Sequence, residues 1–340
     1  MMKFSSEHKE TIIKYILSKI EQKKGGISHG VADAFGISTS TVHLYINELI
    51  RNGIIRKNGR DSYVLTSDKK FFEFSRSKGE MESEEDIFRS TLMPLMSGLP
   101  ENAKVIWHYA FSEMINNVID HSDAEHLRVV VDMSYLTTVV SIFDDGVGVF
   151  RKIRDHFGLS SVEDAIVELS KGKLTTDRAH HSGEGIFFTS RIMDEFLVWS
   201  DGKAYSFNKY YEEAMADTEE KFDFGTAVYL ALSNSSEKQL TDVFDEYSDT
   251  ENGFVKTRIP LKNIFETAPI SRSQAKRLGS RLEEFREAEL DFDGIEYIGQ
   301  GFAHEIFCVF ANAHPEIKLI PLNMSENVKK MYRHVTAELM

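Results

Sequence analysis

Apolar side chains recur every three or four residues in three stretches near the start of the chain, with polar residues between them. This spacing predicts a helix over residues 9–20, a short helix over 28–35 that Ser28 caps, and a longer helix over 38–50 that Ser38 caps. Gly36 lies between the second and third helices and provides the turn. Two helices joined by a short glycine turn are typical of a helix-turn-helix.

Two strand-like runs, residues 54–57 and 60–65, follow on either side of Asn58-Gly59, a dipeptide typical of hairpin turns. Helices followed by a hairpin predict a winged helix-turn-helix over residues 1–70, whose last helix would enter the major groove of double-stranded DNA. The candidate DNA-binding residues are Thr39, Ser40, His43, Asn47 and Arg51 on the helix and Arg56, Lys57 and Arg60 on the hairpin. No Lys or Arg lies between Ser38 and Ile50. The alternative is therefore a winged helix that contacts protein.

Two polar, charge-rich stretches, residues 71–86 and 233–255, predict linkers. They leave a central domain over residues 87–232 and a C-terminal region over 256–340. In the C-terminal region helices and strands alternate, which predicts a small α/β domain. Among its elements, a helix is expected over residues 278–288. The chain is therefore expected to be a multidomain α+β protein.

Short segments of the central domain carry residues suited to a magnesium nucleotide. Glu113 and Asn117 lie four residues apart on a predicted helix, so both face one cleft. The carboxylate can deprotonate water, and the amide oxygen is a hard ligand for Mg²⁺. Asp144, Gly146 and Gly148 follow a strand-like run, where the glycines permit a tight turn and the carboxylate can accept a hydrogen bond from an exocyclic amine.

Gly183 and Gly185 open a further helix, predicted over residues 184–193, whose first free N–H groups can hold phosphate. Together these motifs, with the later Gly225-Thr226, resemble the nucleotide-binding motifs of the GHKL superfamily, which unites gyrase-type ATPases, Hsp90, histidine-kinase catalytic domains and MutL. The resemblance implies a GHKL/Bergerat α/β sandwich that binds ATP and Mg²⁺. It implies Glu113 as catalytic base, Asn117 as metal ligand, and a nucleotide held by Asn117, Asp144, Gly146, Gly148, Gly183, Gly185 and Thr226.

A GHKL fold places its ATP lid between the second and third motifs. Five cations there could reach phosphates: Lys171, Lys173, Arg178, His180 and His181. The superfamily includes ATP hydrolases, protein serine/threonine kinases that act on anti-sigma-type partners, and binders that switch shape, and the motifs do not decide among them. A histidine kinase is disfavoured, because residues 84–122 are too short for its dimerising helical hairpin.

The C-terminal segment Asp291-Phe-Asp-Gly294 and the apolar residues after it resemble the STAS-like domains, relatives of anti-sigma-factor antagonists. In the antagonists, a serine after this strand is phosphorylated by a GHKL kinase. The corresponding stretch here, residues 298–302, contains no hydroxyl. The resemblance therefore implies a regulatory protein partner for this domain rather than an internal kinase substrate.

Charge is spread unevenly along the chain. Of the net −14, residues 1–70 contribute +5, from twelve Lys and Arg against seven Asp and Glu, and the remainder carries −19. A basic head on an acidic body is typical of a DNA-binding module joined to a domain that avoids DNA. The single cysteine, Cys308, suits a reducing compartment, and no apolar run approaches membrane-spanning length, so a cytoplasmic protein is expected.

These patterns together predict an ATP-responsive DNA-binding transcriptional regulator. A homodimer is expected, because one winged helix makes few base contacts and two half-sites restore affinity. Two other classes fit the motifs: a protein serine/threonine kinase of the anti-sigma type, and a non-catalytic scaffold whose winged helix binds protein.

Overall fold

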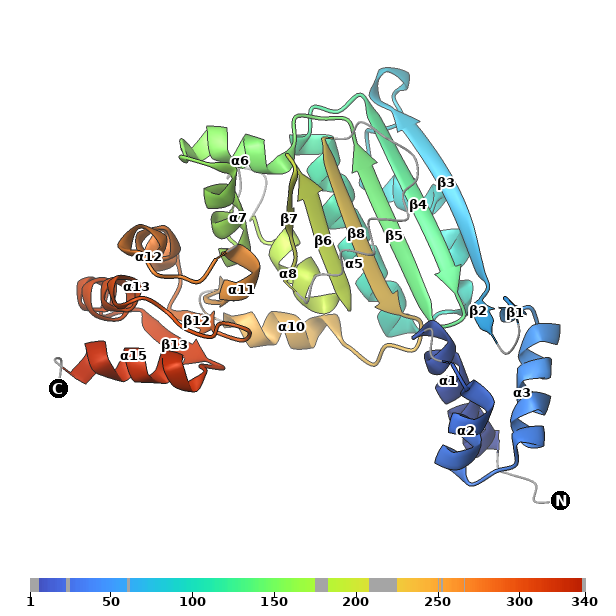
Figure 1. The fold of residues 1–340 in the computed structure, drawn as a ribbon. Coiled ribbons are helices and arrows are strands. Elements are labelled where there is room, and N and C mark those ends of the chain that lie inside the picture. Colours follow the sequence, from blue (N-terminus) through green and yellow to red (C-terminus); the bar gives the residue numbers. More distant parts are fainter. Residues whose placement is uncertain are drawn as a thin grey trace. The chain divides into compact units, whose positions relative to one another are not determined.

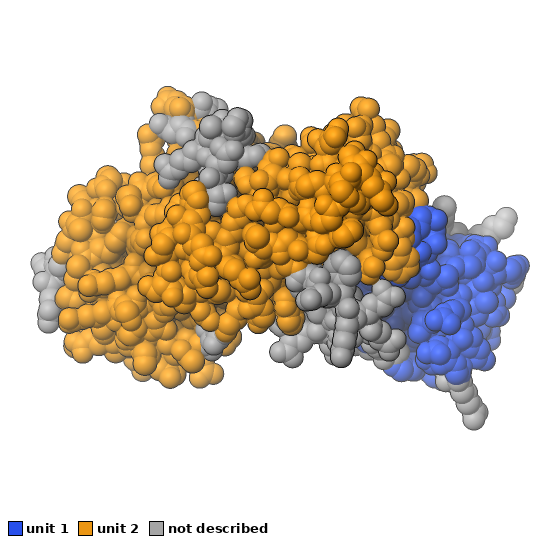
Figure 2. Space-filling view, turned by 90° about the horizontal axis from the view of Figure 1, so that it is seen from above, with its two compact units in different colours: residues 1–70, 130–139, 233–235 blue, residues 71–129, 140–232, 236–340 orange. Residues whose placement is uncertain are grey.

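The structure, a computed structural model, describes residues 6–22, 25–59, 62–174, 183–207, 225–249, 251, 253–265 and 267–337. The chain divides into two compact units, which Figure 2 marks by colour. The first comprises residues 1–70, 130–139 and 233–235, and the second comprises residues 71–129, 140–232 and 236–340. The second unit therefore holds most of the central region together with the whole C-terminal region.

The first unit contains the three predicted helices, α1 (Ser6–Glu21), α2 (Ile27–Phe35) and α3 (Thr39–Arg51). Ser38 caps α3 as predicted, because its Oγ accepts a hydrogen bond of 3.1 Å from the backbone N–H of Thr41. Helix α2 begins one residue earlier than expected, after Gly26 in the left-handed region, so Ser28 is not its cap. Gly36 ends α2 with φ at 62°, which supplies the predicted turn.

A two-stranded hairpin follows the helices in this unit. Strands β1 (Ile55–Lys57) and β2 (Tyr63–Leu65) pair antiparallel, as the Asn58-Gly59 turn predicts. The helices pack around a buried apolar core that includes Ile12, Ile16, Val31, Val42 and Ile46. Ile50, near the end of α3, is an exposed apolar side chain.

The central region is built on a six-stranded sheet in the order β3-β4-β5-β8-β6-β7 (Figure 1). Its strands are β3 (Ser67–Ser75), β4 (His126–Ser134), β5 (Thr137–Asp144), β6 (Glu195–Ser200), β7 (Lys203–Tyr205) and β8 (Thr226–Ser233). Strand β6 is antiparallel to both β7 and β8. Strands β4 and β5 agree with the predicted runs.

Helices α5 and α8 lie against one face of this sheet (Figure 1). The helices of the region are α4 (Glu84–Ser90), α5 (Glu101–His121), α6 (Val149–Phe157), α7 (Val162–Lys171) and α8 (Gly185–Ile192), with 3-10 turns at Arg76–Lys78 and Met93–Gly98. Helix α5 buries an apolar stripe that includes Trp107, Ala110 and Met114, as its spacing predicts. Within the described ranges, no helix has both the length and the apolar character that a membrane crossing requires.

Residues 71–86 are not a linker. Strand β3 occupies the first part of this stretch as an edge strand of the sheet, and α4 begins within its last part. Glu73 pairs with Arg128 of the neighbouring strand at 2.8 Å, and the buried Ser75 donates to Glu125 at 2.8 Å. An edge strand carries charged side chains and buries few of them, so its sequence looks like that of a linker.

The C-terminal region has a parallel sheet of β11 (Lys256–Pro260), β12 (Glu287–Asp291) and β13 (Lys318–Leu322). Its helical segments are α11 (Leu261–Ile264), α12 (Arg272–Gly279), a 3-10 turn (Leu282–Glu284), α13 (Gln300–His304), a π-helical stretch (Glu305–Phe310), α14 (Ala311–Ala313) and α15 (Glu326–Thr336). Parallel strands need crossover connections, which these helices supply, as an α/β domain requires. The helix predicted over 278–288 is wrong, since α12 ends at Gly279 and β12 begins at Glu287.

The described residues of the second predicted linker, 233–249, 251 and 253–255, include regular elements. These are α10 (Leu240–Tyr247) and the short strands β9 (Ser248–Asp249) and β10 (Gly253–Phe254). Aromatic rings of this segment pack on α8: Phe244 lies 4.5 Å from Phe188, and Phe254 lies 4.5 Å from Phe187, between ring centroids. Tyr247 also lies 5.1 Å from Phe187. Phe244, Tyr247 and Phe254 therefore attach the segment to the body of the second unit.

Candidate functional site

A cavity of about 280 Å³ lies in the second unit between α5, α6, α8 and the sheet. Its wall includes seven of the residues that the motifs predict: Glu113, Asn117, Asp144, Gly148, Gly183, Gly185 and Thr226. They come from segments far apart in the chain, and the fold brings them to one place. We call this cavity the motif pocket.

Asp144 forms a deeply buried part of the motif pocket, at the end of β5, with 3% of its surface exposed. Its carboxylate accepts a hydrogen bond of 2.9 Å from the backbone N–H of Gly146 and another from the backbone of Thr226. Burial nevertheless raises the pKa of Asp144 to about 6. A buried carboxylate that is held only by backbone N–H groups is suited to accept a further hydrogen bond from a polar ligand.

The turn after Asp144 is wedged between α5 and β8. A Cβ on Gly146 would lie 2.1 Å from the carbonyl oxygen of Ser122, and one on Gly225 would lie 2.0 Å from the carbonyl oxygen of Gly146. The hydroxyl of Thr226 accepts a hydrogen bond of 3.1 Å from the backbone N–H of Val149. Gly146 therefore shapes the pocket through backbone packing and is not itself in the wall.

Glu113 lies against the first turn of α8. A Cβ on Gly185 would fall 2.0 Å from Oε2 of Glu113, so a side chain at this position would displace the carboxylate from where it lies. Burial, with the negative charges of Glu113 and Glu184, raises the pKa of the nearby Tyr109 hydroxyl. Glu113 and Asn117 are both half-buried on the same side of α5. The arrangement places a carboxylate, an amide and a helix N-terminus around one space.

The backbone closes on itself beside this helix N-terminus. The N–H of Leu174 donates to the carbonyl of Gly183 at 3.1 Å. Gly183 has φ at 71°, and a Cβ there would lie 2.5 Å from the backbone of Leu174. Both residues are in the wall of the motif pocket. Arg178, His180 and His181, expected to reach phosphates, lie outside the described residues.

Lys171 and Lys173, also expected to reach phosphates, point elsewhere. The ammonium of Lys171 is buried, pairs with Glu168 at 2.7 Å and donates to the carbonyl of Arg277 at 3.0 Å. Burial lowers its pKa. Lys173 donates to the carbonyl of Glu284 at 2.7 Å. Both side chains contact the C-terminal region, and neither is in the wall of the motif pocket.

The motifs did not identify every charged residue of the pocket. Lys152, on α6, is in the wall, where it donates to the carbonyl of His121 and to the carboxylate of Asp123 at 3.2 Å. Its position four residues after Gly148, in a helix that follows the glycine turn, is the signal that could have found it.

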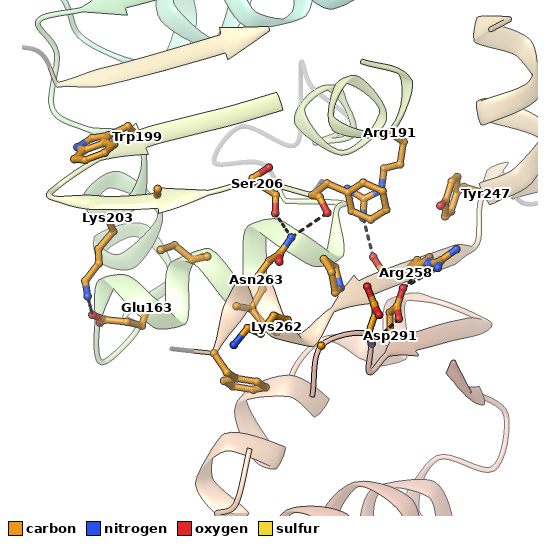
Figure 3. A pocket seen from close by; sticks show the side chains of 18 of the residues that line it. Glu163, Arg191, Trp199, Lys203, Ser206, Tyr247, Arg258, Lys262, Asn263 and Asp291 are labelled. Carbon is orange, nitrogen blue, oxygen red and sulfur yellow. Dashed lines mark hydrogen bonds and ion pairs between the residues drawn. The ribbon is translucent and has the colours of Figure 1, made fainter. Parts of the chain in front are cut away.

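A second and larger cavity, of about 1140 Å³, lies between the sheet edge and the C-terminal region (Figure 3). Most of its charged groups are already paired or stacked. Lys203 pairs with Glu163 at 3.1 Å, and Arg258 pairs with Asp291 at 2.7 Å. The guanidinium of Arg191 lies 3.5 and 3.9 Å from the rings of Phe187 and Phe207 and donates to the carbonyl of Arg258 at 2.8 Å. We call this cavity the junction cavity; no motif predicted it.

The predicted DNA-binding residues lie on the first unit. Four of the five from α3, namely Ser40, His43, Asn47 and Arg51, are exposed, and Thr39 is half-buried. Arg56 and Lys57 on β1 are exposed, and Arg60 lies outside the described residues. Leu44, 60% exposed, interrupts the polar face of α3 with an apolar side chain.

Comparison with known families covers the C-terminal region. Residues 274–329, which run from α12 to the first turn of α15, match the family described as "STAS-like domain of unknown function (DUF4325)". The STAS-like prediction is therefore confirmed for these residues. No match to a GHKL or winged-helix family was found. A search of curated proteins gives no match to the chain.

Proposed function

We propose that the protein is an ATP-responsive DNA-binding transcriptional regulator. In this proposal, a GHKL-type nucleotide domain lies in the chain between an N-terminal winged helix-turn-helix and the STAS-like domain. The observation that carries the proposal is the meeting of residues from four separate motifs in the wall of one cavity of about 280 Å³. A chance scatter of such residues over the surface would not produce this convergence.

The residues of the motif pocket fit a magnesium nucleotide. The buried carboxylate of Asp144 would accept a hydrogen bond from the exocyclic amine of adenine. Gly183 and Gly185 lie at the start of α8, where free N–H groups favour phosphate. Asn117 would supply an oxygen to Mg²⁺, and the bound ion would neutralise phosphate charge. This division puts the base at Asp144 and the phosphates at Gly183 and Gly185.

The position of Glu113 is compatible with turnover as well as with binding. Its carboxylate faces the same space as the start of α8, where it could orient or deprotonate water. A protein kinase of the anti-sigma type would use the same residue. ATP labelled on the γ-phosphate separates these reactions: release of inorganic phosphate indicates an ATPase, and label on a protein indicates a kinase.

The first unit supports the DNA-binding part of the proposal. Its three helices and hairpin follow the order of a winged helix-turn-helix, and most of the predicted contact residues are exposed. A homodimer would present two such surfaces to two half-sites. Coupling between a ligand site and a second site is typically about 1–3 kcal/mol, so ATP would change DNA affinity by roughly 5- to 150-fold.

A gel shift with genomic DNA fragments, with and without Mg-ATP, tests this function. The double variant Arg56→Ala/Lys57→Ala should weaken binding to any duplex and lower the slope of log K against log salt by about 2, because each phosphate contact contributes about 0.9. The control, Lys329→Ala/Arg333→Ala, removes the same charge from the partly exposed helix α15 and should leave binding unchanged. Unchanged binding in the first variant would show that this face does not meet DNA. Failure of the wild type to retain any duplex would favour the protein-binding scaffold.

A further inference from the structure

Helix α7 joins the motif pocket to the STAS-like domain. Leu169 of this helix is in the pocket wall. Four polar residues of the same helix are buried: Asp164, Glu168, Ser170 and Lys171. Buried charge is stable only where it is paired and hydrogen-bonded, and here the partners of the charged side chains include residues of the C-terminal region.

The ammonium of Lys171 is held at the end of α12. Besides Glu168, it donates to the carbonyl of Arg277 at 3.0 Å and to that of Ser280. The last carbonyls of a helix lack partners within the helix and carry its negative dipole end, so they are suited to hold a cation. Asp164 adds a second link from α7, with an ion pair to Arg277 at 2.7 Å. The side chains of Lys171 and Asp164, both on α7, therefore bind residues of the STAS-like domain.

Arg281 extends this link from α7 to the residues after it. Its guanidinium donates to Glu168 at 3.3 Å and to the backbone carbonyl of Lys173 at 2.8 Å. Both Arg281 and Lys173 have positive φ, 59° and 53°, which non-glycine residues rarely adopt. Such strained backbone persists where the surroundings fix it, and it concentrates at functional sites. The two strained residues are joined by the hydrogen bond between them.

From Lys173 the chain leads directly into the motif pocket. The next residue, Leu174, is in the pocket wall and pairs with Gly183 beside the start of α8. Gly172 is packed so closely that a Cβ would lie 2.7 Å from the ring of Phe254 and 2.9 Å from that of Phe187. Residues 172–174 therefore contact the C-terminal segments on one side and the presumed phosphate end of the pocket on the other.

Helix α8 provides a second connection. Its N-terminal turn borders the motif pocket, and its last turn carries Arg191 at the junction cavity (Figure 3). Arg191 donates to the carbonyl of Arg258, on the strand β11 that pairs with β12 of the same sheet. The side chain of Arg258 in turn pairs with Asp291 at the end of β12. Residues 172–174 are thus attached to the end of α12, and helix α8 is attached to the C-terminal sheet.

We infer that the STAS-like domain positions the phosphate side of the nucleotide pocket, with Arg281 as the positioning residue and the Lys171–Glu168 pair as its support. The inference rests on the proposed nucleotide binding and adds that the STAS-like domain regulates this binding. Coupling free energies are reciprocal. A protein that binds the STAS-like domain and shifts α12 therefore changes ATP affinity, and ATP changes the affinity for that protein.

The variant Arg281→Asn tests the inference in the full-length chain. Asparagine tolerates positive φ better than most residues that carry a Cβ, so the backbone is retained while the contacts to Glu168 and Lys173 are lost. Affinity for Mg-ATP should fall at least five-fold. Affinity for adenosine, which lacks phosphates and depends on the Asp144 end, should stay the same. Calorimetry measures the affinity for Mg-ATP, and ligand-observed NMR measures the affinity for adenosine. The control Arg333→Asn, which removes an exposed arginine of α15, should change neither affinity.

A second readout needs no variant. Mg-ATP, but not adenosine, should slow amide hydrogen exchange in residues 277–284 of the wild type. If Arg281→Asn weakens the binding of both ligands equally, or of neither, the inference is overturned, since a merely structural role of Arg281 gives that result. Exchange in residues 277–284 that Mg-ATP leaves unchanged would overturn it as well. A wild type that binds neither ligand would overturn the proposed function and the inference with it. If the wild type binds both ligands and Arg281→Asn leaves the ratio of the two affinities unchanged, the inference is overturned but the proposed function is not.

Discussion

The motif pocket and the junction cavity differ in size and in chemistry, and the two differences point in opposite directions. The junction cavity is the larger, at about 1140 Å³ against about 280 Å³. Its principal ions, Glu163 with Lys203 and Arg258 with Asp291, already have one another as partners. The motif pocket contains a buried carboxylate held by backbone N–H groups and a helix start against which a second carboxylate, that of Glu113, lies. Chemistry, rather than volume, therefore marks the smaller cavity as the candidate site.

The two cavities share a wall. Leu169 and Phe187 face the motif pocket, while Ile166 and Arg191 of the same two helices face the junction cavity. We therefore expect substitutions to have effects of decreasing size in this order: in the shared wall of α7 and α8, in the glycine turn of the motif pocket, at the buried carboxylate of Asp144, and in the junction cavity.

The largest effect is expected in the wall. Lys171→Met removes one partner of a buried ion pair and should lower the free energy of unfolding by about 3–5 kcal/mol. The chain supplies a matched control in Lys329→Met. Lys329 pairs with Glu326 at the same three-residue spacing and at 2.8 Å against 2.7 Å, but both its groups are solvent-accessible. That variant should change stability by less than about 1 kcal/mol. Equal effects in denaturant unfolding would contradict the buried wall.

The next effect concerns the turn of the motif pocket. Gly225→Ala places a Cβ 2.0 Å from the carbonyl oxygen of Gly146, which is backbone and cannot swing away. We expect a loss of about 2–3 kcal/mol in stability. Gly30→Ala, in helix α2, meets nothing within 4 Å and should instead stabilise by up to about 1 kcal/mol. Thermal unfolding of both variants measures the contrast, and a neutral Gly225→Ala would mean that β8 and the turn are further apart.

A smaller effect follows from the raised pKa of Asp144. Because burial raises the pKa of this group to about 6 in the folded protein, from 3.8 in the unfolded chain, the folded state binds the proton more readily between these values. Stability from this group is thus present at low pH and is lost as pH rises through 6. Between pH 7 and pH 5 the wild type should gain about 1 kcal/mol relative to Asp144→Asn. Denaturant unfolding at both pH values gives this difference, and a constant difference would place Asp144 in water.

The smallest effect is expected at the junction cavity. Glu163→Gln breaks the ion pair with Lys203. The side chain of Glu163 is 42% exposed and that of Lys203 is 35% exposed, so the free energy of unfolding should change by less than about 1 kcal/mol. Mg-ATP affinity should not change. A large loss of nucleotide binding in this variant would reverse the assignment of the two cavities.

The sequence identified those parts of the site whose residues are close together in the chain. Glu113 and Asn117 keep their relation within one helix, so spacing predicted that they face one cleft, and both line the motif pocket. That Asp144 and Gly148 join them there was implied by the family resemblance. Spacing could not predict that Lys171 and Lys173 donate to the carbonyls of Arg277 and Glu284, which lie more than 100 residues further along the chain.

The same limit explains the errors in the fold. The sequence predicts linkers over residues 71–86, where β3 ends, and over 233–255, because charged residues between the few buried side chains dominate the pattern there. Only the neighbouring elements, α8 and β4 among them, show what those side chains pack against.

The most direct test of the account is the dissociation constant for Mg-ATP, measured by calorimetry on the full-length chain. The double variant Asn117→Ala/Asp144→Asn should bind at least 100-fold more weakly than the wild type, a loss of about 2.8 kcal/mol. Asn263→Ala, which alters the junction cavity alone, should bind as the wild type does. Absence of binding by the wild type, or equal binding by the double variant, would contradict the central claim that the motif pocket is a nucleotide site.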